Sequence, residues 1–313
     1  MYQLKNLHIV LTYKCNLSCK HCYLNCSPNR SEKIDYTLLA SAIENLYETN
    51  PLRKISITGG EPLIYPDFLN LVRYCSNFDV ELILATNATL MNKDIANGLK
   101  DLVDKVYISL DGCCSKTHDK FRNKRGAFNK TVRGLINLRN AGIQTNLTCT
   151  ISKENINEVP KILEIAYDLA ARGIEFRGIS SIGRGINCSK INSQELENLL
   201  ETVSNETSAK SDIYNMKTKK ERFDSYPPCV AGFMKASIMP DGAMVPCSAF
   251  VNMTKIDNMD YIQKREPSEI WNKPKSKIWN MLRTFPKDID AKGCRAEALS
   301  RGSIYLDLPE ANL

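Results

Sequence analysis

The sequence lacks any apolar run that approaches the roughly 18 residues of a membrane-spanning helix, and no low-complexity tract interrupts its 313 residues. Its first residues, MYQLKNLHIVLTYK, lack the apolar core and the small-residue cleavage site of a signal peptide. These absences argue against a membrane protein or a secreted one. We therefore expect a cytoplasmic protein whose thiols stay reduced.

The basic residues also lack a feature, because no aromatic side chains are interleaved with them as in a nucleic-acid site. The net charge of +7 is spread over the whole length, and we expect the densest run, residues 217–222, to be a solvated surface loop. We expect no nucleic-acid partner, although a basic surface suits an acidic peptide. Hydrophobic residues make up 43% and charged residues 25%, which is typical of a globular protein.

Strand-like and helical segments alternate over the first 180 residues. We expect strands at 7–13, 54–57, 80–86, 105–110, 143–151 and 174–179, and helices at 35–47, 66–76, 92–101, 127–140 and 158–172. Asp35 is the expected N-cap of the first helix, and Gly173 the expected C-cap of the last. This alternation predicts an α/β fold with a parallel sheet, either open or closed into a barrel.

Polar and glycine-rich loops at the carboxyl ends of the strands favour the barrel, and we predict a partial (β/α)6 barrel. The alternation stops after residue 190. We therefore predict a core domain over residues 1–190 and a small C-terminal extension over 191–313.

Twelve cysteines are many for a protein with reduced thiols, and they indicate metal or redox chemistry. Cys15, Cys19 and Cys22 follow the first predicted strand, where barrels bind ligands. Three thiolates can hold a 4Fe–4S cluster and leave its fourth iron open for chemistry. Cys26 would close such a cluster, which would then only transfer electrons. Zinc is the alternative, although it usually takes two separated Cys-x2-Cys pairs.

The Cys-x3-Cys-x2-Cys spacing after the first strand of a six-fold strand–helix domain resembles the radical S-adenosylmethionine (SAM) enzymes. The resemblance implies that SAM binds the open iron through its amino and carboxylate groups. An electron donor such as flavodoxin or ferredoxin would reduce the cluster. Cleavage of SAM would then give a 5′-deoxyadenosyl radical, which removes a hydrogen atom from a substrate carbon.

Further segments carry the same resemblance. Gly59-Gly60-Glu61 is similar to the family's GGE motif, in which Glu61 or a nearby backbone carbonyl would accept hydrogen bonds from the SAM amino group. The other implied cofactor-binding residues are Asn87 after the third strand, Ser109 and Asp111 after the fourth, and Arg122 in the segment HDKFR. Arg122 would pair with the SAM carboxylate. Residues 182–185 would lie near the adenine, and ordinary turn and cap roles remain the alternative for these residues.

The C-terminal cysteines resemble the SPASM/twitch extension, which carries auxiliary iron–sulfur clusters. Cys229 and Cys247 flank a predicted hairpin with the turn MPDG, and Cys294 lies in GCRAEA. The full extension uses more cysteines, and Ala291 stands where one is common, so we expect at most one auxiliary cluster. Its fourth ligand would be Cys188, a carboxylate or substrate. A metal-free extension is the alternative.

Cys113 and Cys114 follow the fourth strand, whereas Cys75 and Cys149 are typical of buried apolar positions. A Cys114 thiol near the radical could donate a hydrogen atom to the substrate radical and complete an epimerisation.

The resemblance favours an enzyme that modifies a peptide or protein, by crosslink formation or epimerisation of a ribosomally made peptide. Because the first strand begins by residue 7, we expect no N-terminal peptide-binding domain and allow for a separate adaptor protein. The alternatives are a small-molecule radical SAM enzyme of cofactor or tetrapyrrole biosynthesis and a non-catalytic metal-binding protein.

Overall fold

One curved sheet forms the centre of the molecule. The computed structural model describes residues 2–192, 194–195, 198–199, 229–252 and 259–284. Within them, eight strands pair in the order β6-β5-β4-β3-β2-β1-β7-β8. Their bounds are β1 (Asn6–Val10), β2 (Lys54–Thr58), β3 (Glu81–Thr86), β4 (Lys105–Ser109), β5 (Thr145–Ile151), β6 (Gly173–Gly178), β7 (Lys235–Ile238) and β8 (Met244–Val245).

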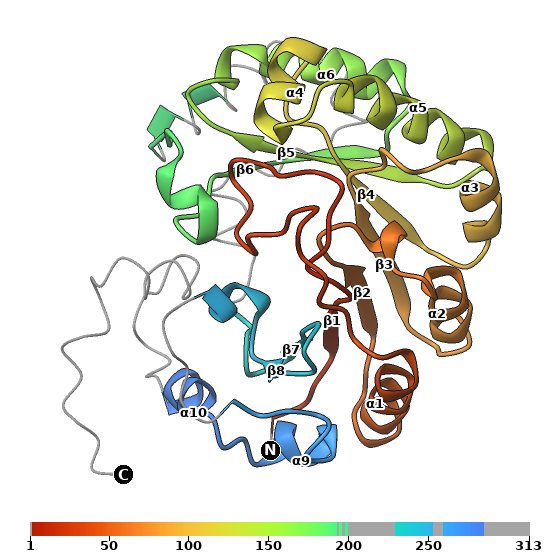
Figure 1. The fold of residues 1–313 in the computed structure, drawn as a ribbon, viewed down its shortest axis with the longest axis vertical. Helices are drawn as coiled ribbons and strands as arrows, with labels where there is room; N and C mark the ends of the chain where they lie inside the picture. The colour runs from red at the N-terminus through yellow and green to blue at the C-terminus, as the bar shows by residue number, and fades with distance from the viewer. Residues whose placement is uncertain (1, 193, 196–197, 200–228, 253–258, 285–313) are drawn as a thin grey trace.

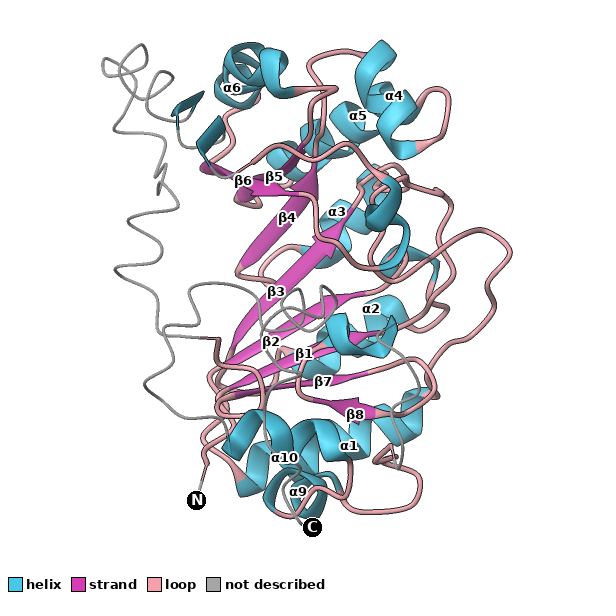
Figure 2. Cartoon of the chain, turned by 90° about the vertical axis from the view of Figure 1, so that its left-hand side faces the viewer, coloured by secondary structure: helices cyan, strands magenta, loops and turns pink. Residues whose placement is uncertain are grey.

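The strands from β6 to β7 are all parallel, and β8 is antiparallel to β7. Figure 1 shows the sheet as an open arc with the crossover helices on its outer side. These are α1 (Tyr36–Thr49), α2 (Phe68–Cys75), α3 (Lys93–Leu99), α4 (Ser115–Arg122), α5 (Ala127–Asn140) and α6 (Val159–Asp168). The predicted α/β partial barrel is confirmed, and Figure 2 shows that its strands direct their carboxyl ends to the same edge.

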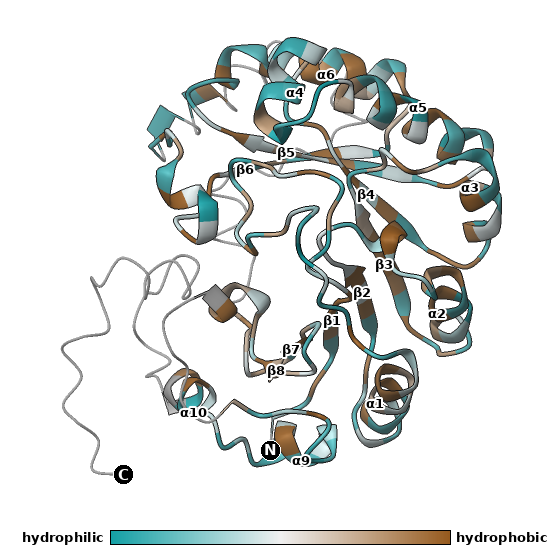
Figure 3. Cartoon of the chain, in the orientation of Figure 1, coloured by the Kyte–Doolittle hydropathy of each residue, from teal (hydrophilic) through white to brown (hydrophobic). Residues whose placement is uncertain are grey.

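Apolar periodicity explains why these segments pair and pack. The first helix turns Leu39, Ile43 and Leu46 into the core, and the Asp35 carboxylate accepts a hydrogen bond from Leu38 N at 2.9 Å. The predicted N-cap is therefore confirmed. Burial alternates along β5, as expected for a strand with one face against helices and the other toward the barrel interior. Figure 3 shows the corresponding mixture of apolar and polar faces on the outer helices.

The predicted end of α6 is wrong. The helix ends at Asp168, Ala170 turns the chain with a positive φ of 53°, and Gly173 already pairs with Asn146 as the first residue of β6. A helix reaching Arg172 would have removed the connection that brings β6 beside β5. Residues 115–122, for which no helix was predicted, form α4.

The C-terminal segment extends the same sheet. The predicted hairpin is confirmed, because β7 and β8 are antiparallel and Gly242 turns between them with a φ of 82°. β7 lies beside β1, and α9 (Pro267–Asn272) and α10 (Lys277–Thr284) follow. The basic run at 217–222 and Cys294 lie outside the described residues. No described helix is long and apolar enough to cross a membrane. The boundary near residue 190 stays a prediction.

Candidate active site at the carboxyl ends of the strands

Four thiols lie in the loop between β1 and α1, the three predicted cluster ligands and Cys26. Cys15 and Cys19 are buried and Cys22 is half-buried, and none is in a disulfide. One zinc ion holds thiolates at about 2.3 Å, so two of its ligands are at most about 4.6 Å apart. Among the described residues, the loop thiols do not form a group of three whose ligand atoms all lie within 4.8 Å of one another. This spacing suits a multi-iron cluster better than a single ion.

The segment after β6 holds this loop in place. The Arg184 guanidinium donates to the carbonyl of Cys19 at 2.8 Å and to that of Cys26 at 2.7 Å, and Arg184 N donates to Cys22 O at 3.1 Å. Gly183 has a φ of 57°, and a Cβ there would lie 2.4 Å from Tyr23 O. These residues were predicted to lie near the adenine, and their contact with the cysteine loop was not predicted, because nothing local signals a contact across more than 150 residues.

The glycine pair after β2 contacts the same loop. Gly60 N donates to Thr12 O at 2.6 Å, and Glu61 N donates to Lys14 O at 3.0 Å. A Cβ on Gly60 would lie 2.3 Å from Lys14 O and 2.9 Å from the Cβ of Cys15. The absence of a side chain at Gly60 therefore lets the loop carrying Cys15 come close to the end of β2. Gly59 is similarly close, with its hypothetical Cβ 3.0 Å from Thr12 O.

Glu61 connects the ends of β2 and β3. Its carboxylate is fully buried and accepts hydrogen bonds from Thr86 Oγ1 at 2.6 Å and from Asn87 N at 2.9 Å. Burial raises the pKa of Glu61 to about 7, against the effect of these hydrogen bonds. The Asn87 amide donates to Asn16 Oδ1 at 3.1 Å and lies 3.8 Å from the Cys15 sulfur. Glu61 thus orders the residues around Cys15, and its contact with SAM stays a prediction.

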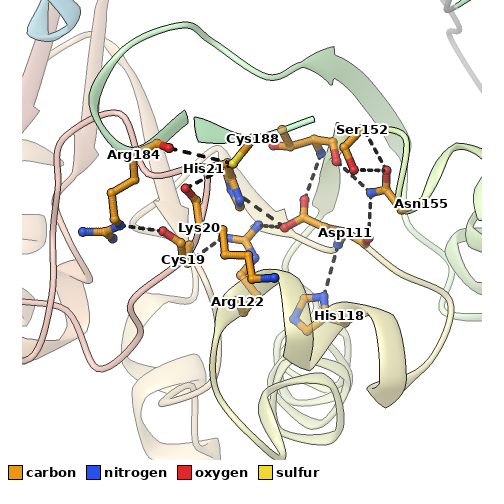
Figure 4. Close-up of polar contacts among 11 residues, drawn as sticks. Cys19, Lys20, His21, Asp111, His118, Arg122, Ser152, Asn155, Arg184 and Cys188 are labelled. Carbon is orange, nitrogen blue, oxygen red and sulfur yellow. Dashed lines mark hydrogen bonds and ion pairs between the residues drawn. The ribbon is translucent and has the colours of Figure 1, made fainter. Parts of the chain in front are cut away.

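Asp111 and Arg122 form a buried ion pair, with Arg122 Nη2 2.6 Å from Asp111 Oδ2 (Figure 4). The other terminal nitrogen of the guanidinium, Nη1, donates a hydrogen bond to the Cys19 sulfur at 3.6 Å. Burial lowers the pKa of Arg122, but the charges of Asp111 and Cys19 outweigh this effect and raise it. The arginine is therefore a fixed cation between a carboxylate and a cysteine that is expected to bind iron.

Asp111 is itself held from three sides. Asp111 N donates to His118 Nδ1 at 3.1 Å, and Asn155 Nδ2 donates to Asp111 O at 2.8 Å (Figure 4). Thr150 N donates to Asp111 Oδ1 at 2.8 Å. Ser109 is half-buried at the end of β4. Sequence reasoning missed His118 and Asn155, although His118 stands next to Asp119 in the segment HDKFR.

The described site fits an iron–sulfur cluster and a polar ligand. Burial raises the pKa of Cys15 to about 12, so a thiolate there needs a compensating cation. A hydrogen bond from Cys26 lowers the pKa of Cys22 to about 6. Within the part of the chain that the structure describes, the buried atoms His21 Nδ1 and Arg122 Nε have no hydrogen-bond partner. A ligand with carboxylate or amino groups would supply such partners.

The remaining predicted residues lie on two sides of this site. Cys114 is half-buried at the start of α4, and Cys188 donates to Lys20 O at 3.3 Å, against the cysteine loop. Cys229 and Cys247 are half-buried and free. Ser248, next to Cys247, is hydrogen-bonded to the Tyr23 hydroxyl at 3.1 Å, so the C-terminal segment contacts the cysteine loop. Cys294 lies outside the described residues.

The fold and the site together define a protein of the partial-barrel type, with free thiols gathered at the carboxyl ends of parallel strands. The family model "Radical SAM superfamily" matches residues 9–166, half of the chain, and the model "Iron-sulfur cluster-binding domain" (SPASM) matches residues 229–296. The chain belongs to the radical SAM superfamily and carries a C-terminal SPASM-like extension. When bound, the 4Fe–4S cluster of this family supplies the electron that cleaves SAM.

Several curated proteins are similar to this chain. It is 32% identical over 193 residues to the AdoMet-dependent heme synthase of Methanosarcina barkeri, covering 61% of this chain and 55% of that one. It is 27% identical over 255 residues to the subtilosin biosynthesis protein AlbA of Bacillus subtilis, covering 80% and 56%. It is 34% identical over 178 residues to the mycofactocin maturase MftC of Mycolicibacterium smegmatis, covering 56% and 44%. The chain thus spans about half the length of these relatives.

A solved structure confirms the fold. Streptococcus suis SuiB bound to S-adenosylmethionine superposes with a TM-score of 0.81 at 17% sequence identity, covering 96% of this chain and 75% of that chain. The parallel sheet with outer helices is therefore a known architecture.

Proposed function

We propose that this radical SAM enzyme modifies a ribosomally made peptide, by crosslink formation or epimerisation. The similarity to the subtilosin biosynthesis protein carries this proposal, because it extends over 80% of the chain. The similarity to the mycofactocin maturase supports it independently. A flavodoxin or ferredoxin would supply the electron, and a separate adaptor protein would deliver the peptide.

In this proposal Cys15, Cys19 and Cys22 hold the cluster at the barrel mouth. Arg122 fixes the charge beside Cys19, and Asp111 fixes Arg122 through their 2.6 Å ion pair. The residues proposed to surround SAM are Gly59, Gly60, Glu61, Asn87, Ser109, Asp111 and Arg122. Of these, Glu61, Asn87, Asp111 and Arg122 are buried and the others half-buried, which would limit the access of water to the radical.

Mass spectrometry of a co-expressed precursor peptide tests the proposal. Neighbouring genes are searched for a short reading frame, and its product is isolated after anaerobic co-expression. A crosslink appears as the loss of two hydrogen atoms, and an epimerisation in D2O appears as the gain of one deuterium. The Cys15→Ala variant is the control and should give unmodified peptide. Cleavage of SAM without any change in the candidate peptides would contradict the proposal.

Cys114 is the proposed hydrogen donor if the reaction is an epimerisation. The Cys114→Ala variant should then still produce 5′-deoxyadenosine but release peptide that is not inverted. Normal inversion by this variant would dismiss the role.

One auxiliary cluster held by Cys229, Cys247 and Cys294 belongs to the proposal, because the SPASM model spans all three residues. Replacing the three by Ala should lower the iron content and leave SAM cleavage intact. An unchanged iron content would show that these thiols hold no cluster.

Tetrapyrrole biosynthesis is the second candidate, favoured by the 32% identity to a heme synthase. Incubation of the reduced enzyme and SAM with iron porphyrins separates the two. Conversion of a porphyrin, with all candidate peptides unchanged, would favour the second function.

A further inference from the structure

Two adjacent thiols and a carboxylate meet outside the cysteine loop. Cys113 and Cys114 lie between β4 and α4, and Glu158 ends the short 3-10 helix η2 (Ile156–Glu158) before α6. The two sulfurs and a carboxylate oxygen of Glu158 all lie within 4.8 Å of one another. All three side chains are half-buried, so solvent can reach them while the surrounding chain restricts their motion.

Hydrogen bonds hold the Glu158 carboxylate close to the two thiols. Glu158 Oε2 accepts from Cys113 N at 2.8 Å, and Glu158 Oε1 accepts from Thr117 Oγ1. The Cys114 sulfur lies 4.0 Å from the same Thr117 hydroxyl. Each carboxylate oxygen has a further lone pair for a cation. The three ligand atoms are thus held together by the backbone of the β4–α4 loop and by the first turn of α4.

The electrostatics favour a cation at this point. Burial raises the pKa of Cys113 to about 11, and the Glu158 carboxylate adds to this effect. The Thr117 N–H at the start of α4 lowers the pKa of Cys114. A divalent cation would compensate the negative charges that these groups carry when ionised.

We propose that Cys113, Cys114 and Glu158 form a binding site for a thiophilic divalent cation such as Zn²⁺. Two thiolates and one carboxylate are ordinary zinc ligands, and water would take the fourth tetrahedral position. Binding breaks the S–H bond of each thiol that is still protonated and releases the proton to solvent. The site does not depend on the substrate proposed above.

The cation would join two segments that already meet at Asp111. Cys113 follows Asp111 by two residues, and Glu158 follows Asn155, whose amide donates to Asp111 O at 2.8 Å. Occupancy would therefore stabilise the loop that fixes the Asp111–Arg122 ion pair. It would also remove the Cys114 S–H hydrogen, so a zinc-bound Cys114 does not donate a hydrogen atom.

Zinc titration of the iron-loaded holoenzyme tests the site. The anaerobic protein competes with a chromophoric chelator, and we expect one Zn²⁺ per chain with the iron content unchanged. Cys114→Ser and Glu158→Gln should each weaken zinc binding at least tenfold, because even the loss of an outer-shell partner of a ligand typically costs 10- to 100-fold in metal affinity. Glu154→Gln is the matched control, because Glu154 lies near Glu158 in sequence but pairs with Lys120 at 2.9 Å. It should bind zinc as the wild type does.

X-ray absorption at the zinc edge gives an independent readout. We expect two sulfur ligands with oxygen ligands completing the shell, and a rise of a few degrees in the unfolding midpoint on zinc addition. A shell of four sulfurs would place zinc in the loop of Cys15 to Cys26 and overturn the proposal. Equal zinc affinity in the wild type and in Glu158→Gln, or no stoichiometric binding, would overturn it as well.

Discussion

Substitution of Gly60 by Ala tests how the end of β2 positions the proposed cluster ligands. The added Cβ would lie 2.3 Å from Lys14 O and 2.9 Å from the Cβ of Cys15. Ordinary van der Waals contact begins near 3.4 Å, so the cysteine loop must move away by about 1 Å. Lys14 C=O is backbone and cannot rotate out of the way. The movement therefore also displaces Cys15 and disturbs the 2.6 Å hydrogen bond from Gly60 N to Thr12 O.

The expected cost is about 3 kcal/mol, the upper part of the range for overpacked sites. The effect on the cluster should be larger, because metal–ligand distances tolerate only about ±0.2 Å. A shift of the Cys15 sulfur by about 1 Å would leave one iron without the ligand proposed for it. We expect Gly60→Ala to fold but to retain little iron and to cleave little SAM.

The assay measures iron per chain after anaerobic reconstitution, together with 5′-deoxyadenosine formed from SAM under a chemical reductant. Gly178→Ala is the matched control, because a Cβ at the end of β6 meets no heavy atom within 4 Å. It should keep both iron and cleavage. Wild-type iron content and cleavage in Gly60→Ala would refute the argument that close backbone contact positions Cys15.

Three other predictions test the site. Cys15→Ala, Cys19→Ala and Cys22→Ala should each abolish SAM cleavage, and a variant with full cleavage would remove that residue from the ligand set. Arg184→Lys should retain less iron and lower the free energy of unfolding by about 2 kcal/mol, because an ammonium cannot reach both loop carbonyls. An unchanged iron content would contradict this prediction. Burial, with the Lys235 and Arg177 charges, lowers the pKa of His8 to about 3. Neutral His8 therefore favours the folded state, and this contribution to the free energy of unfolding is present above pH 6.5 and lost as the pH falls toward 3. Wild type should lose about 2 kcal/mol more than His8→Leu between pH 7 and pH 5 in denaturant unfolding, and equal losses would show that His8 is protonated when folded.

The sequence predicted the barrel because each of its elements is encoded locally. Strand-like runs and amphipathic helices follow from the spacing of apolar residues within a few turns, and the Asp35 cap depends on one side chain and the backbone three residues later. The end of α6 was mispredicted, because Gly173 is a plausible cap by sequence. Its pairing with Asn146 instead places it in β6.

The candidate site was predictable only in part. The cysteine spacing and the glycine pair are contiguous motifs, so they were found directly. The contacts of the half-buried Arg184 and of the buried His118 and Asn155 were missed. Arg184 contacts carbonyls 158 and 165 residues away in the chain, and no local pattern encodes such a contact.

The sequence by itself showed the resemblance to the radical SAM superfamily, because the motifs that carry it are contiguous and place their residues in one loop whatever surrounds them. Only the tertiary structure decided the role of the glycine pair and of Glu61, which hold the cysteine loop against the ends of β2 and β3. It also decided that Cys113 and Cys114 face Glu158. The physical reason is that parallel strands bring their carboxyl ends to one edge, so groups distant in sequence meet there only once the sheet has formed.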